Sequence, residues 1–210
     1  MDAIEVLREL SSALAPPRCA VCGAETSARH LICTGCDGAL AAGPPGRGAV
    51  AGLGSVTWAA PYDGAARRLV ASLKFGGGLG LAAIAGRAIA GTLAADLGRW
   101  TIVAVPAAPL RRRRRGFDPA ELIADELATR LGLERASVLR RRNGPRQVGR
   151  PRGERLGSPP RVRAIDTAPH RTLVVDDVMT TGATLSACAA ALRGAGASEV
   201  QGAVFARALG

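Results

Sequence analysis

LVVDDVMTTGAT, residues 173–184, is the part of the sequence that most constrains the fold. An apolar run ends in two adjacent carboxylates, and a short loop of threonine and glycine then leads into a segment with helical spacing. Continuous apolar runs of this kind are typical of strands at the centre of a parallel sheet. Ligands of such sheets bind where the strands end, and a helix that begins there presents free N–H groups to a phosphate. The stretch therefore predicts a buried strand followed directly by a phosphate site.

The polar residues of this stretch suit a sugar phosphate. Gly182 allows the backbone to approach a ligand closely. Hydroxyl donors are supplied by Thr180, Thr181 and Thr184. Asp176 and Asp177 would repel a phosphate unless they accept hydrogen bonds from hydroxyl groups or face a cation, and the hydroxyls of a ribose and Mg²⁺ meet those needs. The alternative interpretation is that the two carboxylates only end the strand and that the loop is an ordinary turn.

Outward from this stretch, helical and strand patterns alternate, which predicts an α/β fold with a mainly parallel sheet. A helix is expected over 183–193 and a last strand over 200–206. The elements expected upstream are a strand and turn within 55–64, a strand over 101–106, and helices over 63–75 and 79–97. Aromatic residues make up only 3% of the chain, so the core must consist mainly of Ala, Val and Leu.

The clearest helix signal covers residues 118–132. Asp118 can act as the N-cap and Pro119 suits the first helical position. Glu121 is placed to complete a capping box, and Gly132 is placed to end the helix.

Two arginine-rich segments are expected to be loops. Residues 111–115 are five consecutive arginines after a predicted strand, which indicates a basic loop. Residues 140–163 are dense in Arg, Gly and Pro without apolar periodicity, which predicts a long exposed loop. A loop of that length inside a compact domain is usually either functional or disordered.

Four cysteines near the N-terminus form two C-x-x-C pairs, Cys19 with Cys22 and Cys33 with Cys36. Four thiolates at this spacing suit tetrahedral zinc, and a complete set of four leaves no open position for water, so the metal is expected to be structural. The alternatives are two disulfides or a redox pair. The first is disfavoured because nothing indicates export, and the second because there are two pairs and no adjoining βαβ unit.

Two modules are expected. A stretch rich in Gly, Pro and Ala, residues 41–52, is predicted to link them. The boundary is placed so that residues 1–45 hold a short helix over 1–14 and the zinc module, and residues 46–210 hold the parallel-sheet domain.

The charge is distributed unevenly between these modules. The formal net charge is +11, and because residues 1–45 carry three arginines against five carboxylates, their share is −2 and the remainder carries +13. Such a surplus attracts polyanions, whether nucleic acid, acidic membranes or phosphorylated metabolites. The N-terminus lacks the pattern of a secretory signal, and the most apolar stretch is interrupted by Arg87 and Asp96. A cytoplasmic protein without membrane insertion is expected.

With these motifs in place, residues 173–184 resemble the phosphoribosyl diphosphate signature of type I phosphoribosyltransferases. The whole chain from Cys19 onward resembles the ComF/GntX family of competence-related proteins, in which a four-cysteine zinc module precedes a phosphoribosyltransferase-like domain. Besides the cysteines and the signature, the matching residues are Tyr62, Leu73-Lys74-Phe75, Val105-Pro106, Arg115-Gly116-Phe117, Gln147 and Glu154-Arg155. The family commonly has Asn-Gln where this chain has Asp118-Pro119, so one side-chain amide is lost.

The resemblance implies a role for each residue of the signature. Asp176 and Asp177 would hold the ribose hydroxyls, directly or through Mg²⁺. The 5′-phosphate would be wrapped by Thr180, Thr181, Gly182, Ala183 and Thr184. The turn after Val105 and Pro106 would contact pyrophosphate, and residues 147–155 are similar in position to the flexible lid of these enzymes.

A transferase of this type separates pyrophosphate from C1′ through a cation-like transition state, so Mg²⁺ and basic groups must stabilise the leaving group. Lys74 and Arg115 are therefore candidate catalytic residues beside Asp176 and Asp177. No residue pattern indicates the acceptor base. Whether the protein catalyses transfer thus stays open.

Two functions follow as hypotheses. The first is a phosphoribosyltransferase-like protein that binds phosphoribosyl diphosphate with Mg²⁺ and serves DNA uptake, competence or nucleotide salvage. The second is a competence protein that keeps the fold without catalysis and binds single-stranded DNA, which the +13 charge favours and the shortage of aromatic residues disfavours. A docking role of the zinc module toward DNA-uptake proteins is compatible with both.

Overall fold

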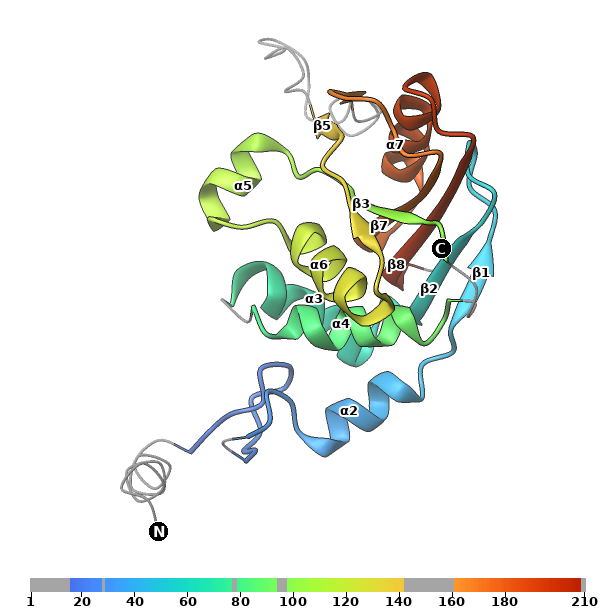
Figure 1. Cartoon of the computed structure of the whole chain (residues 1–210). Coiled ribbons are helices and arrows are strands. Elements are labelled where there is room, and N and C mark those ends of the chain that lie inside the picture. The colour runs from blue at the N-terminus through green and yellow to red at the C-terminus, as the bar shows by residue number, and fades with distance from the viewer. Residues whose placement is uncertain (1–15, 28, 77–78, 94–97, 142–160, 209–210) are drawn as a thin grey trace, which may run out of the picture.

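The computed structural model describes residues 16–208 apart from residues 28, 77–78, 94–97 and 142–160. These residues form a sheet with helices on both faces, and the small cysteine-containing module lies against one helical layer (Figure 1). The predicted α/β class with a mainly parallel sheet is confirmed. No helix in this described part of the chain has the length and apolar character needed to cross a bilayer.

Six strands form the main sheet in the order β1-β2-β8-β7-β3-β4, and every neighbouring pair is parallel except β1 with β2. The two longest strands, β7 and β8, lie at the centre. The strands are β1 (Gly46–Gly48), β2 (Val56–Pro61), β3 (Thr101–Ala104), β4 (Glu134–Arg135), β7 (Arg171–Met179) and β8 (Glu199–Arg207).

Three helices cover one face of the sheet, and one covers the other (Figure 1). The first layer contains α3 (Gly64–Phe75), α4 (Leu81–Ala90) and α6 (Pro119–Leu131), and the second contains α7 (Ala183–Gly194). Side chains alternate along β7, so Leu173 and Val175 join the core under the three helices while Val174 joins the core under α7. The run of consecutive apolar residues in β7 follows because helices cover both faces of this strand.

The predicted strand before the phosphate loop extends two residues further than its sequence pattern indicated. Val178 and Met179 still pair with β8, opposite Ala206 and Arg207. The loop between β7 and α7 is therefore limited to residues 180–182.

The basic loop predicted over residues 111–115 is wrong, because these arginines form most of helix α5 (Pro109–Arg115). Pro109 lies in the first turn, arginine is a good helix former, and Gly116 ends the helix with a φ of 77°. None of its residues is buried, and the helix projects away from the sheet (Figure 1). A helix without an apolar face gives no periodic signal, which is why it was not predicted.

The loop predicted over residues 140–163 is wrong at both ends. β5 (Leu139–Arg141) and β6 (Val162–Ala164) pair as antiparallel strands. Residues 142–160, including the lid residues Gln147, Glu154 and Arg155, lie outside the described residues. The helix predicted over 79–97 begins at Leu81 and ends at Ala90, and its predicted last residues also lie outside that description.

The stretch predicted as a linker is partly ordered into regular structure. It contains the end of α2 (Thr34–Ala41) and all of β1, which pairs with β2. A Cβ atom on Gly46 would lie 2.3 Å from the ring of Trp58, so this strand approaches β2 at a distance that only glycine permits. The proposed module boundary near residue 46 stays a prediction.

The helix signal at Asp118 is confirmed, with one change. The Asp118 side chain accepts a hydrogen bond from the Ala120 N–H, and Gly132 ends the helix with a φ of 63°. Glu121 does not take the predicted capping-box role toward Asp118, since its carboxylate pairs with Arg135 on β4. The Glu121 carboxylate is thus attracted to the Arg135 guanidinium and not to the backbone N–H of Asp118.

Candidate functional site

The four cysteines come together in space, as their spacing predicts. Cys19 and Cys22 lie on a tight turn in which Gly23, with a φ of 76°, donates its N–H to the Cys19 carbonyl at 2.8 Å. Cys33 is the N-cap of α2, and Cys36 lies in its first turn. The four sulfur atoms lie within 4.8 Å of one another, with 3.7 Å between those of Cys22 and Cys33.

This arrangement fits a tetrahedral metal. Four thiolates at about 2.3 Å from a zinc ion lie about 3.8 Å from one another. All four cysteines are free thiols. The N-terminus of α2 adds a favourable field for negative sulfur atoms. The cluster can therefore hold a zinc ion.

Protonation of the cluster is uneven. Burial opposes ionisation of the Cys19 thiol, but hydrogen bonds from the backbone of Cys33, Cys22 and Val21 outweigh it and lower its pKa to about 6. Burial raises the pKa of Cys36 to about 12, and the neighbouring cysteines add to the rise. A divalent cation must therefore displace at least the proton of Cys36 when it binds.

The cysteine module is joined to the α3–α4 layer. Val21 and Ile32 are buried in the same apolar core as the inner faces of α3 and α4. The Ser72 hydroxyl on α3 donates to the carbonyl of Ala20, and Arg87 on α4 pairs with Asp37 at 3.0 Å. The module thus holds the end of α3, two residues before Lys74.

A cavity of about 170 Å³ lies at the carboxyl end of the central strands and brings together most of the predicted site. Predicted residues that line it are Lys74, Arg115, Asp176, Asp177 and Thr184. The turn after β3, containing Val105 to Ala108, forms another wall. Thr180, Thr181, Gly182 and Ala183 lie between the two carboxylates and Thr184 in the chain, on the loop that starts α7.

Asp177 faces the three-helix layer. It is buried, and the Nζ atom of Lys74 lies 2.8 Å from its Oδ1 atom. The Lys74 side chain is 23% exposed, so it contacts the buried Asp177 carboxylate and also lines the cavity. The pair supports the prediction that these residues act in one site.

Asp176 faces the other side of the sheet, toward α7. Burial and the nearby charge of Asp177 raise its pKa well above the ordinary value, although the N–H of Asp177 donates to its Oδ1 atom at 2.8 Å and Lys74 opposes the rise. Its charge in turn adds to the burial that raises the pKa of Cys188 on α7 to about 12. A cation beside Asp176 would favour its ionised form.

The loop at the start of α7 has the backbone geometry of an anion cradle. Gly182 is the N-cap with a φ of 78°, and a Cβ atom there would lie 3.0 Å from both methyl groups of Val50. The Thr181 hydroxyl lies 3.4 Å from the N–H of Ala183. Only glycine both adopts this positive φ and leaves room for Val50. The N–H groups of the first turn of α7 are directed toward the loop.

The turn after β3 is fixed from two sides. The Val105 N–H donates to the Val175 carbonyl at 2.9 Å, and the Ala107 N–H donates to Oδ2 of Asp118 at 2.8 Å. Burial raises the pKa of Asp118. Hydrogen bonds from the backbone N–H groups of Ala107 and Ala120 partly offset this rise. Asp118 therefore caps α6 and also positions the turn, a role that its sequence pattern did not reveal.

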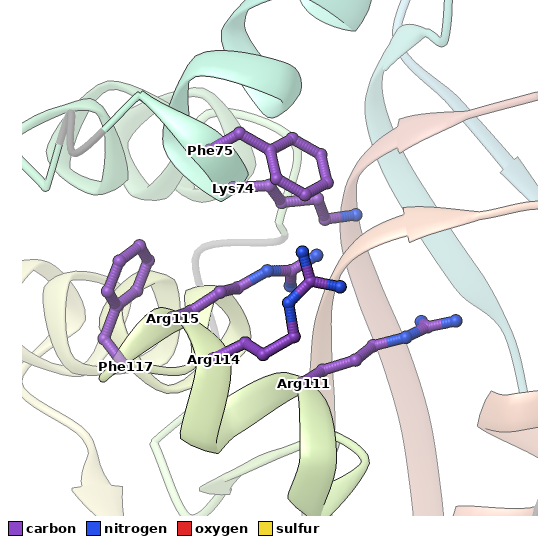
Figure 2. Close-up of a pocket in the computed structure, with 6 residues that line it drawn as sticks. All are labelled: Lys74, Phe75, Arg111, Arg114, Arg115 and Phe117. Carbon is purple, nitrogen blue, oxygen red and sulfur yellow. The ribbon is translucent and has the colours of Figure 1, made fainter.

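A second, larger cavity shares Lys74, Arg111 and Arg115 with the first. Lys74 and Phe75 approach it from the end of α3, and the arginines reach it from α5 (Figure 2). The guanidinium carbon of Arg115 lies 4.9 Å from the centre of the Phe75 ring. Phe75 and Phe117 were not assigned to the site from sequence, although Leu73-Lys74-Phe75 and Arg115-Gly116-Phe117 are two of the stretches that carry the family resemblance.

Comparison with known proteins agrees with this geometry. The family model of the phosphoribosyl transferase domain matches residues 113–209, which include α6, β7, the phosphate loop and α7. Competence protein ComFC of Streptococcus pneumoniae is 32% identical over 104 residues, which is 49% of this chain and 46% of that protein. This similarity, the matched domain and the four-cysteine cluster together fit a ComF-like protein. The chain matches less than half of that relative's length.

Among solved structures, this protein is similar to an allosteric regulatory enzyme of purine biosynthesis. The identity is 19% and the TM-score 0.42, over 59% of this chain and 25% of that one.

We expect this protein to bind zinc through the four cysteines and to lose it on acidification, because protons compete for the thiolates. Cys22→Ser should abolish stoichiometric zinc, measured by atomic emission after dialysis. Cys188→Ala, which changes the fifth cysteine, is the control and should retain the metal. Full zinc content in Cys22→Ser would contradict the assignment.

We expect Asp176→Asn to stabilise the metal-free and ligand-free site. Since the folded-state pKa is raised, the wild-type carboxyl loses stability as the pH rises through that pKa, whereas Asn does not. The gain should be on the order of 1 kcal/mol in denaturant unfolding and should grow as the pH rises above the ordinary pKa of an aspartate, about 4.

Asp177→Asn is the matched comparison and should destabilise the protein, because it leaves Lys74 without its ion-pair partner. If the Asp176→Asn protein is less stable than wild type at neutral pH, the pKa of Asp176 is not raised in the folded protein.

Proposed function

We propose that this protein binds phosphoribosyl diphosphate together with Mg²⁺ at the cavity where β3 and β7 end. The observation that carries the proposal is the convergence of Lys74, Asp176, Asp177 and Thr184 with the turn after Val105 on one cavity. The matched phosphoribosyl transferase domain supports the same substrate class.

The 5′-phosphate is assigned to the loop of residues 180–184. Its threonine hydroxyls and the N–H groups at the start of α7 are donors, and α7, with twelve residues, contributes the positive end of its dipole. Gly182 allows the phosphate oxygens close to the backbone.

The ribose hydroxyls and Mg²⁺ are assigned to Asp176 and Asp177. Carboxylate oxygens are hard ligands of the kind Mg²⁺ prefers, and the raised pKa of Asp176 means that a cation would relieve an electrostatic cost already present. When bound, Mg²⁺ would supply charge neutralisation for the pyrophosphate. Lys74 already balances Asp177, so the site carries less net negative charge toward the phosphates than its two acids imply.

Pyrophosphate is assigned to the turn after Val105 and to Lys74, Arg111 and Arg115. Any transfer would break the bond between C1′ and the pyrophosphate oxygen, which leaves with the electron pair. Cationic groups held at that oxygen stabilise the charge that develops there. Asp118 holds the turn rigid, so its backbone is already in place when the ligand arrives.

The biological setting that we propose is DNA uptake during competence or nucleotide salvage, in the cytoplasm. The name of the Streptococcus pneumoniae relative supports the first, and the substrate class supports both. The zinc ion is proposed to be structural, because four cysteines fill its coordination shell and the module holds α3.

A second function is favoured by one observation. Helix α5 carries five consecutive arginines and no buried residue, which suits contact with the phosphates of single-stranded DNA. Arg112 and Arg113 line a cavity with Arg140 and Arg141, in which Asp118 and Glu121 are the acidic residues. Such binding is electrostatic and falls steeply with salt.

Calorimetric titration of phosphoribosyl diphosphate tests the first function. With Mg²⁺ we expect binding by the zinc-loaded wild-type chain, and without Mg²⁺ a loss of affinity. An Asp176→Asn/Asp177→Asn double variant should lose the magnesium-dependent part. The Asp166→Asn variant, which changes an exposed carboxylate on another loop, is the control. Absence of binding by folded, zinc-loaded wild type would refute the proposal.

Fluorescence anisotropy of a labelled oligothymidylate tests the second function. Arg112→Gln/Arg113→Gln should weaken binding and lower the slope of log affinity against log salt by about 1.4, since each lost phosphate contact on a single strand contributes about 0.7. Arg67→Gln/Arg68→Gln removes two exposed arginines from α3 and is the matched control. Equal effects of the two pairs would mean that α5 is not the DNA site.

A further inference from the structure

The four cysteines of the cluster are not equally accessible to solvent. Cys19 and Cys36 are buried, whereas Cys22 is exposed and Cys33 is half-buried. Cys33 also lines a cavity of about 680 Å³ between the cysteine module and α4. A small oxidant that arrives from solvent therefore meets Cys22 and Cys33 before it meets the other two cysteines.

The two accessible cysteines also have their sulfur atoms in contact, at a distance of 3.7 Å. A disulfide bond is about 2 Å long, so a modest shift of the exposed turn that carries Cys22 is enough to join them. Zinc binding removes the protons of its thiol ligands, so both sulfurs are thiolates in the loaded chain, and the thiolate is the form that reacts with peroxides. A bond between Cys22 and Cys33 would link the two C-x-x-C motifs, unlike a redox pair within one motif.

The first C-x-x-C motif is attached to the end of α3. Ala20 lies inside this motif, and its carbonyl accepts a hydrogen bond from the Ser72 hydroxyl on α3. Ser72 is two residues before Lys74, whose Nζ atom lies 2.8 Å from Oδ1 of Asp177. A rearrangement of the motif therefore reaches the end of the helix that supplies the lysine of the cavity.

We propose that Cys22 and Cys33 are an oxidation site that hydrogen peroxide converts to a disulfide, with loss of zinc from the cluster and loosening of the end of α3. The Cys22 thiolate attacks one peroxide oxygen, the O–O bond breaks, hydroxide leaves and the cysteine becomes a sulfenic acid. The Cys33 thiolate then attacks this sulfur and expels a second hydroxide. The two thiolates lose two electrons in total, and the peroxide gains them. Cys19 and Cys36 alone are too few ligands for a structural zinc site.

The consequence for ligand binding rests on the proposed function. Lys74 pairs with Asp177 and lines the cavity assigned to phosphoribosyl diphosphate, so a less ordered end of α3 should lower the affinity for this ligand. Reduction of the disulfide and return of zinc should restore it. The cysteine module would then report the presence of peroxide to the cavity.

Peroxide treatment of the full, zinc-loaded chain tests the inference. We expect release of the bound zinc, followed with a chromophoric chelator, and a Cys22–Cys33 disulfide in peptide mass spectrometry without reductant. A dithiol with added zinc should restore the metal content. Zinc that stays bound under peroxide, or a main product that joins Cys19 to Cys22 or Cys33 to Cys36, would overturn the inference.

A ligand exchange locates the reactive sulfur. Cys22→His replaces the exposed thiolate by an imidazole, which is also a zinc ligand, and should slow peroxide-driven zinc release by at least about tenfold. Cys188→Ala changes a buried thiol outside the cluster and should release zinc at the wild-type rate. Equal rates in Cys22→His and wild type would mean that Cys22 is not the site of attack. If Cys22→His does not hold zinc, the disulfide found in the wild-type chain decides.

Hydrogen exchange tests the coupling to α3. Oxidation should speed exchange of the amides in the last turn of α3, while α7, on the other face of the sheet, serves as the internal reference and should not change. Ser72→Ala removes the link to Ala20 and should reduce the difference between the two states. Exchange in α3 that is the same before and after oxidation would overturn the coupling.

The failure of this inference differs from the failure of the proposed function. A chain that forms the disulfide and releases zinc, but binds no phosphoribosyl diphosphate in either state, would overturn only the proposed function. A chain that binds phosphoribosyl diphosphate and keeps its zinc under peroxide would overturn only the oxidation site.

Discussion

Successive residues of a strand point to opposite faces of the sheet, and at Asp176 and Asp177 this rule places two adjacent carboxylates in different surroundings. Asp177 meets Lys74 from the three-helix layer, while Asp176 lies on the α7 side with a raised pKa. The pair therefore does not act as a doubled charge. One acid is paired with a lysine of the protein itself, and the other is the carboxylate that we propose for a ligand hydroxyl or a cation.

The parts of the molecule that lie far apart in sequence are arranged around this pair. Lys74 is at the end of α3, which the cysteine module holds through Ser72. The turn opposite the carboxylates is held by Asp118, at the start of α6. The cysteine module thus contributes to the architecture of the cavity without lining it, since it contacts the helix that supplies the lysine.

The sequence predicted most reliably those elements whose signal is local. The apolar run of β7, the cap at Asp118 and the spacing of the four cysteines each follow from a few neighbouring residues, and the structure confirms them. Helix α5 was missed because a helix without an apolar face has no period to detect. The aromatic cavity was missed because Phe75 and Phe117 meet only through the tertiary fold.

The order of strands also bears on how the chain is made. β2 lies next to β8, although about 140 residues separate them in the sequence. Until β8 has been synthesised, no strand connects β2 to the pair formed by β7 and β3. Because this pairing joins distant parts of the sequence, folding of this domain is expected to be slow. A nascent chain that stalls before residue 199 exposes an unpaired strand edge, which makes it a natural client for chaperones.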